Sequence, residues 1–204
     1  MQIVPRRQHD AGGGSGTTLL LRCATREDAH AIARILKESA DDGLVARSDE
    51  VDPGAVSRQI ESARAASNSL YIVATIQKPG IPTSGSPVFA NATAEAFDDD
   101  EVIGLLLLEG APLLRLHDVA RLTMAVTPSH RDKGVGRHMM RYAMECADAS
   151  GLVRKIELLT RANNDRAIKL YTSLGFVEEG RLRARLKLED GSYLDDVCMA
   201  RFKP

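Results

Sequence analysis

The apolar residues of this chain recur with two different spacings, and each spacing is typical of one kind of secondary structure. Stretches that are continuously apolar, or that alternate apolar and polar residues, favour β-strands. Apolar residues three and four positions apart favour helices that bury one face. The first pattern predicts strands at residues 17–24, 70–76, 102–108, 120–126 and 155–160.

The second spacing predicts four helices between these strands. Thr25 is a suitable N-cap for the first helix, and Pro53 suits the first turn of the second. The apolar rows of the four helices are Ala29, Ile32, Ala33 and Leu36; Val56, Ile60 and Ala63; Val135, Met139, Ala143 and Cys146; and Ala167, Leu170, Tyr171 and Leu174.

The C-terminal segment predicts a β-hairpin, because basic and apolar residues alternate from residue 181 to residue 188. Asp190-Gly191 fits a type I′ turn, which would set Asp196 opposite Arg185 as a favourable cross-strand pair. The basic residues could form an RNA- or phosphate-binding face. A solvent-exposed face is the simpler interpretation, since no aromatic residues interleave with them for stacking on bases.

The length of 204 residues suits one domain. Residues 1–16 contain Gly-Gly-Gly-Ser-Gly and few apolar residues, so we expect a flexible tail there. Residues 77–101 are rich in Pro, Gly, Ser, Ala and Asp, and they are more numerous than a hairpin loop needs. We therefore expect a domain at residues 17–204 that carries a mobile insertion at about residues 77–101.

Composition and charge exclude several classes of protein. The net charge of −1 provides no field that would attract nucleic acid or a membrane surface. No apolar run approaches the roughly 20 residues of a membrane span, and the N-terminus lacks the apolar segment of a secretory signal. Cys23, Cys146 and Cys198 have neither metal-ligand nor disulfide spacing, so we expect no metal site and a cytoplasmic location.

The most specific chemistry follows the strand predicted at residues 120–126. Arg131, Gly134 and Gly136 have the spacing Arg-x-x-Gly-x-Gly and lead into a helix. Glycines let a ligand approach the backbone closely, and the first turn of a helix has unpaired N–H groups at the positive end of its dipole. Such a turn is suited to a phosphate or pyrophosphate, and the neighbouring basic side chains add positive charge.

Two common phosphate-binding patterns do not fit, because the chain has no Gly-x-x-x-x-Gly-Lys-Ser/Thr and because Arg131 replaces the first glycine of the dinucleotide fingerprint. The sequence Val126-x-Pro128 followed by Arg-x-x-Gly-x-Gly instead resembles the acetyl-coenzyme A (acetyl-CoA) loop of the GCN5-related N-acetyltransferase (GNAT) superfamily. The second motif, Asn164-x-x-Ala-x-x-Leu-Tyr-x-x-x-Gly-Phe176, also resembles that superfamily. The resemblance implies the GNAT fold, an α/β fold with a mixed central sheet of about seven strands flanked by about four helices.

The resemblance also implies how the donor, acetyl-CoA, would bind. The fourth and fifth strands would separate, and the backbone of the fourth strand would pair with the pantetheine arm. The backbone N–H groups of the glycine turn would hold the diphosphate, and Asn164 would lie near the pantetheine arm. The implied donor-binding residues are Met124, Ala125, Val126, Arg131, Asp132, Lys133, Gly134, Val135, Gly136, Arg137, Asn164, Ala167 and Tyr171.

For catalysis, Tyr171 matches the tyrosine that often protonates the leaving coenzyme A sulfur, although a tyrosine of the core would satisfy the same pattern. An N–H group near Met124 or Ala125 could polarise the carbonyl group. Many relatives carry a glutamate on the fourth strand that acts as the general base, but Arg121 occupies that place here. The remaining candidates for the base are Glu109, Asp118, His117, Glu157 or a chain of water molecules.

The resemblance therefore implies an N-acetyltransferase that moves an acetyl group from acetyl-CoA to a primary amine. The acceptor could be an amino acid, a protein N-terminus or a small amine, and the absent glutamate favours an α-amine with a pKa of about 8. Acidic residues between 41 and 52 are either solvated or attract this amine. The alternative is a non-catalytic acyl-CoA sensor or partner-binding module on the same fold, and a homodimer is compatible with either function.

Overall fold

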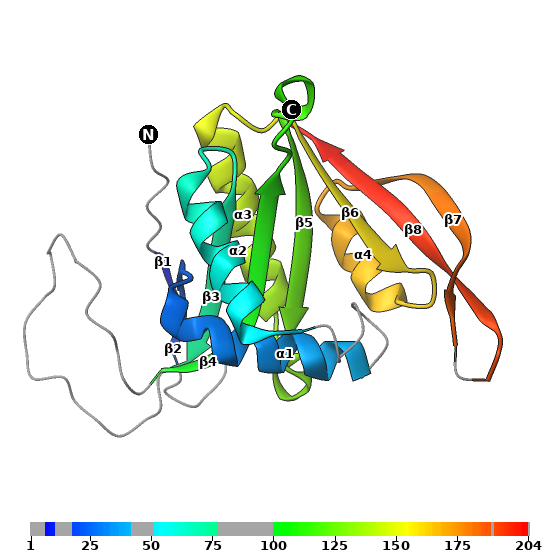
Figure 1. The fold of residues 1–204 in the computed structure, drawn as a ribbon, viewed down its shortest axis with the longest axis horizontal. Helices are drawn as coiled ribbons and strands as arrows, with labels where there is room; N and C mark the ends of the chain where they lie inside the picture. Colours follow the sequence, from blue (N-terminus) through cyan, green and yellow to red (C-terminus); the bar gives the residue numbers. More distant parts are fainter. Residues whose placement is uncertain (1–6, 11–17, 42–50, 77–99, 189, 204) are drawn as a thin grey trace, which may run out of the picture.

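The computed structural model describes residues 7–10, 18–41, 51–76, 100–188 and 190–203. These residues form one sheet of eight strands in the order β1-β2-β3-β4-β5-β6-β8-β7 (Figure 1). The strands are β1 (Arg7–Asp10), β2 (Thr18–Cys23), β3 (Leu70–Ile76), β4 (Glu101–Gly110), β5 (Val119–Val126), β6 (Lys155–Arg161), β7 (Val177–Lys187) and β8 (Tyr193–Phe202). The α-helices are α1 (Ala29–Asp41), α2 (Pro53–Ala65), α3 (Val135–Ser150) and α4 (Asp165–Ser173), with 3-10 turns η1 (Arg26–Asp28), η3 (Leu114–Leu116) and η4 (Pro128–His130).

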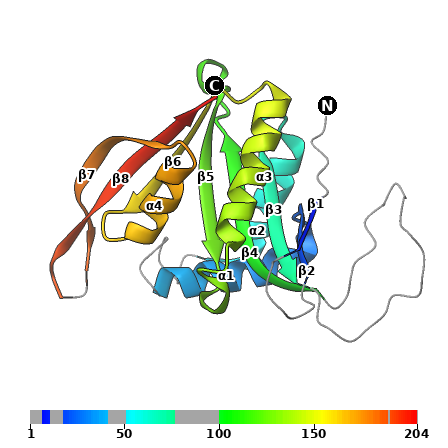
Figure 2. The same cartoon turned by 180° about the vertical axis from the view of Figure 1, so that it is seen from behind.

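Helices cover both faces of the sheet. Helices α1 and α2 lie on one face, and α3 and α4 lie on the other, as two opposite views show (Figures 1 and 2). Each face has its own apolar core, with Ile32 and Ile60 in the first and Met139 in the second. Strand β4 contributes Leu105 to one core and Leu106 to the other, which explains why its sequence is continuously apolar.

The predicted mixed α/β sheet with four helices is confirmed, and β3 has both of its expected ends. The structure has one strand more than the approximate number expected. This strand, β1, pairs with β2 and lies within the segment predicted as a flexible tail. The remainder of that tail and residues 77–99 of the predicted insertion lie outside the described residues. Among the helices of the described ranges, none has the length and apolar character needed to cross a membrane.

The predicted hairpin of β7 and β8 is confirmed, but its predicted register is wrong. Asp196 lies opposite Leu182 and not opposite Arg185. The N–H group of Leu188 donates to the carbonyl oxygen of Ser192 at 2.9 Å, so these two residues pair next to the turn. The expected type I′ turn would have paired Ser192 with the residue after Leu188. The two strands therefore leave the turn one residue away from the predicted register.

A bulge in β7 moves the register further. Ala184 has a φ angle of 49°, and its N–H group donates to the carboxylate of Asp195 at 2.8 Å. This bond satisfies a backbone group that the bulge removes from the strand ladder. The neighbouring carboxylate of Asp196 is buried and pairs with Arg161 of β6 at 2.5 Å. The charge partner of Asp196 is therefore on β6, whereas the sequence had predicted a partner on β7.

A buried carboxylate connects β2 to the start of α1. Asp28 accepts two hydrogen bonds from the guanidinium of Arg22, at 2.7 and 2.8 Å, and one from the backbone N–H group of Thr25 at 2.8 Å. Burial raises the pKa of Asp28, but the hydrogen bonds from Arg22 and Thr25 outweigh it and hold the pKa below its usual value. The ionised carboxylate is therefore stabilised in the folded protein.

We expect the substitution Asp28→Asn to lower the free energy of unfolding by about 2–3 kcal/mol at pH 7, because it removes the charge from a buried pair. The stabilisation is present above the unfolded-state pKa of about 3.9 and is lost as pH falls below it toward the lower folded-state pKa. Denaturant unfolding at pH 7 and pH 3.5 measures the difference. Glu38→Gln is the matched control, since Glu38 forms an exposed pair with Arg34 at 3.6 Å. Equal losses for the two variants would contradict this prediction.

Candidate active site

Strands β5 and β6 run parallel but are paired over only a short length. Val119, Ala120 and Arg121 pair with residues 155–157 of β6, and the pairing ends there. From Leu122 to Val126, β5 remains paired with β4 on its other side. The two strands diverge from this point in both views (Figures 1 and 2). The β6-facing edge of the second half of β5 is therefore not used by the sheet, as the resemblance implied for the fourth and fifth strands.

The glycine turn begins where β5 ends. Two of its residues have positive φ angles, Asp132 at 62° and Gly134 at 83°. The side chain of Arg131 turns back along the strand, and its Nε donates to the carbonyl oxygen of Val126 at 3.0 Å. Arg131 therefore holds the turn against the end of β5. The contact of Arg131 with a diphosphate stays a prediction. Lys133 is more exposed than Arg131.

Helix α3 begins with backbone N–H groups that no capping side chain occupies. Its N-cap residue is Gly134, which has no side chain to accept their hydrogen bonds. In contrast, Asp52 caps α2 and Asn164 caps α4 with side-chain oxygens. The N–H group of His138 donates to the carbonyl oxygen of Gly134 at 3.0 Å, so the N–H groups before it precede the first helical bond. This end of α3 can accept an anion, and the exposed side chain of Arg137 adds positive charge.

The two sequence motifs meet at this turn. A Cβ atom placed on Gly136 would lie 3.4 Å from Met124 of β5 and 3.6 Å from Leu170 of α4. A second link is the ion pair between Asp132 of the turn and Arg166 of α4, at 3.3 Å. The end of β5, the first turn of α3 and the face of α4 therefore converge, although α4 lies about 30 residues later in the chain.

Asn164 has a structural function that the sequence did not reveal. Its side-chain oxygen accepts the backbone N–H group of Ala167 at 3.1 Å, which caps α4. Asn164 and Ala167 thus fix the start of the helix that carries Tyr171. Whether either residue also contacts the donor stays a prediction.

Tyr171 lies at the buried end of this arrangement. Its side chain is 6% exposed, and its ring lies 5.8 Å from the ring of Phe176. Burial raises the pKa of Tyr171 to about 12, because the phenolate would lose its hydration. The hydroxyl group is therefore protonated throughout the physiological range and can donate a proton.

On the face that carries α1 and α2, three charged residues share one row of the sheet. Glu109 of β4 lies opposite Arg121 of β5, and Arg121 lies opposite Glu157 of β6. We call Glu109, Arg121 and Glu157 the charged row. It is the last of the rows that join β5 to β6, and Glu109 is exposed there. Glu109 thus lies next to the point at which the strands separate, on the face opposite to α3.

The other candidate bases are engaged elsewhere. Asp118 accepts a hydrogen bond from Arg154 at 2.7 Å, and this bond holds the pKa of Asp118 below its usual value. The ring of His117 contacts the carbonyl oxygen of Leu114 at 2.9 Å. A lowered pKa weakens a base, so Asp118 is a poorer candidate than Glu109.

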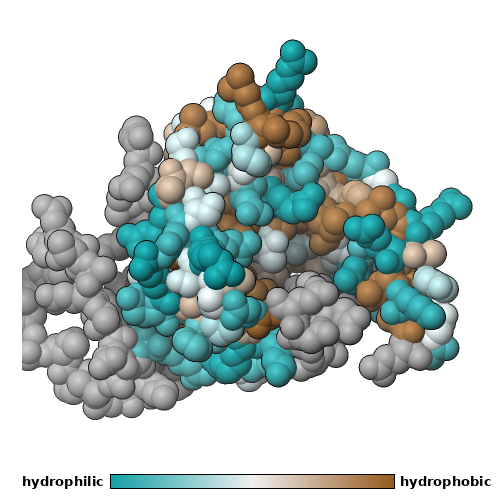
Figure 3. Space-filling view, in the orientation of Figure 1, coloured by the Kyte–Doolittle hydropathy of each residue, from teal (hydrophilic) through white to brown (hydrophobic). Residues whose placement is uncertain are grey.

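Apolar side chains continue this face beyond the charged row. Leu159 of β6, Val177 of β7 and Leu182 of β7 are 44%, 59% and 39% exposed. Their registers through β8 place them on the same face as the charged row. Apolar surface is accordingly visible over β6, β7 and β8 in the space-filling view (Figure 3).

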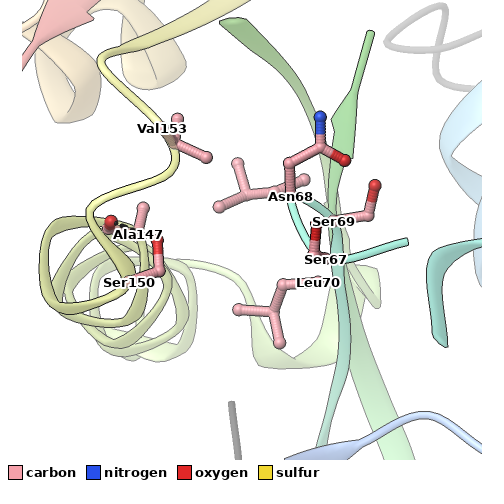
Figure 4. A pocket seen from close by; sticks show the side chains of 8 residues that line it. Ser67, Asn68, Ser69, Leu70, Ala147, Ser150 and Val153 are labelled. Atoms are coloured by element: carbon pink, nitrogen blue, oxygen red, sulfur yellow. Dashed lines mark hydrogen bonds between the residues drawn. The ribbon is translucent and has the colours of Figure 1, made fainter. Parts of the chain in front are cut away.

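A small pocket lies elsewhere, between the C-terminal end of α3 and the start of β3 (Figure 4). It is lined by side chains that include Asn68, Leu70, Ala147 and Val153 and has a volume of about 10 Å³. That volume suits one water molecule at most, so this cavity is no site for a coenzyme or its acceptor.

Comparison with known proteins agrees with this geometry. The sequence model of the Acetyltransferase (GNAT) family matches residues 72–176, which is more than half of the chain. The chain belongs to the GNAT family. The match begins in β3 and ends directly after α4, so it contains the glycine turn and both diverging strands.

Two curated relatives of this GNAT protein have names that specify different amine substrates. The L-amino acid N-acetyltransferase AaaT of Escherichia coli (strain K12) is 33% identical over 105 residues, or 52% of this chain and 64% of that protein. The spermidine N(1)-acetyltransferase of Vibrio cholerae is 32% identical over 76 residues, or 37% of this chain and 44% of that protein. The aligned segments thus span less than two thirds of either relative.

A solved structure supports the GNAT fold over nearly the whole chain. The Salmonella typhimurium protein yncA, solved with its cofactor acetyl-CoA, aligns with a TM-score of 0.71 and 19% identity. The alignment covers 91% of this chain and 94% of that one. At this identity the likeness shows the fold alone.

Proposed function

We propose that this GNAT protein transfers an acetyl group from acetyl-CoA to a primary amine. The observation that carries the proposal is the separation of β5 from β6 directly beside the end of α3 whose N-cap is Gly134. A strand edge and a helix end of this kind offer unpaired backbone groups to one extended, phosphorylated molecule.

The residues present fit the donor. The backbone of Met124 and Val126 would pair with the pantetheine amides on the edge that β6 leaves. The N–H groups from Gly134 to Arg137 would hold the diphosphate, with Lys133 and Arg137 adding charge. Acetyl-CoA would supply the activated acetyl thioester, and all other groups would come from the chain or the acceptor.

The chain would contribute three functions to the chemistry. The backbone near Ala125 would donate a hydrogen bond to the carbonyl oxygen as it gains negative charge. Tyr171, whose raised pKa keeps its hydroxyl group protonated at neutral pH, would donate its proton to the leaving sulfur. Glu109, directly or through water, would accept the proton that the amine loses.

An α-amine suits this set of residues. Its pKa of about 8 leaves a useful neutral fraction at physiological pH, whereas an alkylamine with a pKa of about 10.4 needs a stronger base. The proposed acceptors are an amino acid, a protein N-terminus or a small amine, and the first two of these carry the favoured α-amine. The names of the two curated relatives, one acting on amino acids and one on spermidine, are consistent with this range.

Arg121 supports a second candidate function. It lies where many members of the superfamily carry a glutamate that acts as the general base, and its guanidinium cannot act as a base. A protein that binds acyl-CoA without turnover would need no base. Such a sensor or partner-binding module would keep the donor site and lose the chemistry.

Release of free thiol from acetyl-CoA, measured with a panel of amines, tests the proposal. We expect thiol release that depends on both protein and amine, with the acetylated amine identified by mass spectrometry. Isothermal titration calorimetry with acetyl-CoA is the companion measurement. Binding without turnover of any amine would favour the sensor, and absence of binding would refute both functions.

A further inference from the structure

Arg121 differs from the arginines that the structure describes within β6 and β8 and directly before β6. Arg154 pairs with Asp118, Arg161 with Asp196 and Arg201 with Asp148. Within the described ranges, the side chain of Arg121 forms neither a hydrogen bond nor an ion pair. It therefore presents a full positive charge on an exposed side chain without direct neutralisation.

Arg121 lies beside the gap between β5 and β6, on the face of the sheet that carries α1 and α2. The charged row closes the gap between β5 and β6, and Thr123 follows two residues later on the same face and is also exposed. Helix α3 lies on the other face, so its N-terminal end, proposed to hold the diphosphate, and the charged row are on opposite sides of the sheet (Figure 2). A molecule that reaches the gap from the face of α1 and α2 would meet the charged row.

The charges that flank Arg121 alternate with it. Adjacent strands lie about 4.8 Å apart, so the side chains of Glu109 and Glu157 leave the backbone on either side of the Arg121 side chain. An α-amino acid carries a carboxylate and an ammonium group on one carbon atom. Glu157 lies 3.7 Å from the ammonium group of Lys155, so Glu109 and Arg121 are the acidic and basic pair that is complementary to such a zwitterion. A polyamine carries only positive charges.

We propose that Arg121 binds the carboxylate of the acceptor, and that the acceptor is therefore a free α-amino acid. This inference rests on the proposed acetyl transfer and makes its substrate class specific. A guanidinium can hold a carboxylate with two parallel hydrogen bonds, which would fix the neighbouring amine at the gap. A protein N-terminus, whose first carbonyl is an amide, would lack this contact.

Matched pairs of acceptors test the proposal with the full-length protein. Each of the twenty L-amino acids is compared with its amide and with spermidine, first with the wild type and then with Arg121→Gln. We expect KM for the amino acids to rise about tenfold or more in the variant, since hydrogen bonds to charged groups are strong, with kcat little changed. Amides should show no such rise. Arg121→Lys should recover part of the affinity, and Arg183→Gln, a change at an exposed arginine of β7, should behave as the wild type.

The outcomes separate this inference from the proposed function. Wild-type turnover of amides or spermidine in preference to amino acids would overturn the inference and leave acetyl transfer intact. An unchanged KM for amino acids in Arg121→Gln would overturn it as well. No turnover of any amine would refute the proposed function, and the inference with it.

Discussion

Replacing Gly136 by leucine is expected to weaken acetyl-CoA binding by at least about 100-fold, a loss of about 2.7 kcal/mol. Gly136 lies where the end of β5, the first turn of α3 and α4 converge, with Met124 and Leu170 as its nearest neighbours. A long side chain there would occupy the path of the pantetheine arm between the two strands. Calorimetric titration with acetyl-CoA measures the effect.

Gly136→Ala is the matched variant. Its Cβ atom would lie 3.4–3.6 Å from Met124 and Leu170, which is ordinary van der Waals contact, so the fold should accept it. We expect the alanine variant to bind acetyl-CoA with at most a few-fold loss. The thermal midpoint of both variants shows whether they are folded. A folded leucine variant with normal affinity would exclude this path for the donor.

Removing the hydroxyl group of Tyr171 is expected to lower kcat about 100-fold and to change the dissociation constant of acetyl-CoA much less. Tyr171→Phe keeps the ring, so the contact with the Phe176 ring is preserved. The proton donor to the sulfur is lost, and only the chemical step should respond. Steady-state kinetics and calorimetry together separate these two quantities.

Tyr71→Phe is the control for Tyr171→Phe. Tyr71 is 4% exposed, and burial raises its pKa as it does for Tyr171, but it lies in the core beneath α1 and α2. Its substitution should leave kcat unchanged. The pKa of about 12 also predicts that ionisation of Tyr171 causes no loss of rate below about pH 10, because the acid form disappears only as pH approaches the pKa. An unaltered kcat in Tyr171→Phe would remove this residue from the mechanism.

Several features of the structure depend on neighbouring residues alone, and the sequence was sufficient for these. The strand at Leu70–Ile76 was predicted from a continuous apolar run, and the helix that starts at Pro53 from the placement of proline, which are both local features. The glycine turn was recognisable for the same reason. Gly134, with a φ angle of 83°, adopts a conformation that glycine favours.

The C-terminal hairpin shows where local patterns fail. Alternation predicted the strands, but the partner of Asp196 was wrong because the turn and the bulge at Ala184 both shift the register. One residue of slip moves every side chain relative to its partner strand. The strand β1 was missed for a related reason, since a short edge strand is stabilised by pairing with β2 and not by its own apolar pattern.

By itself, the sequence determined the type of nearly every element, the phosphate-binding character of the turn and membership of the GNAT superfamily. The resemblance implied that β5 and β6 separate, but only the tertiary structure decided that they do so after three paired residues, and that Glu109, Arg121 and Glu157 share one row. The physical reason is that strand pairing joins segments distant in the chain, with a register set by packing and bulges. Which face a side chain occupies, and whether a charge meets a partner there, follows from that pairing.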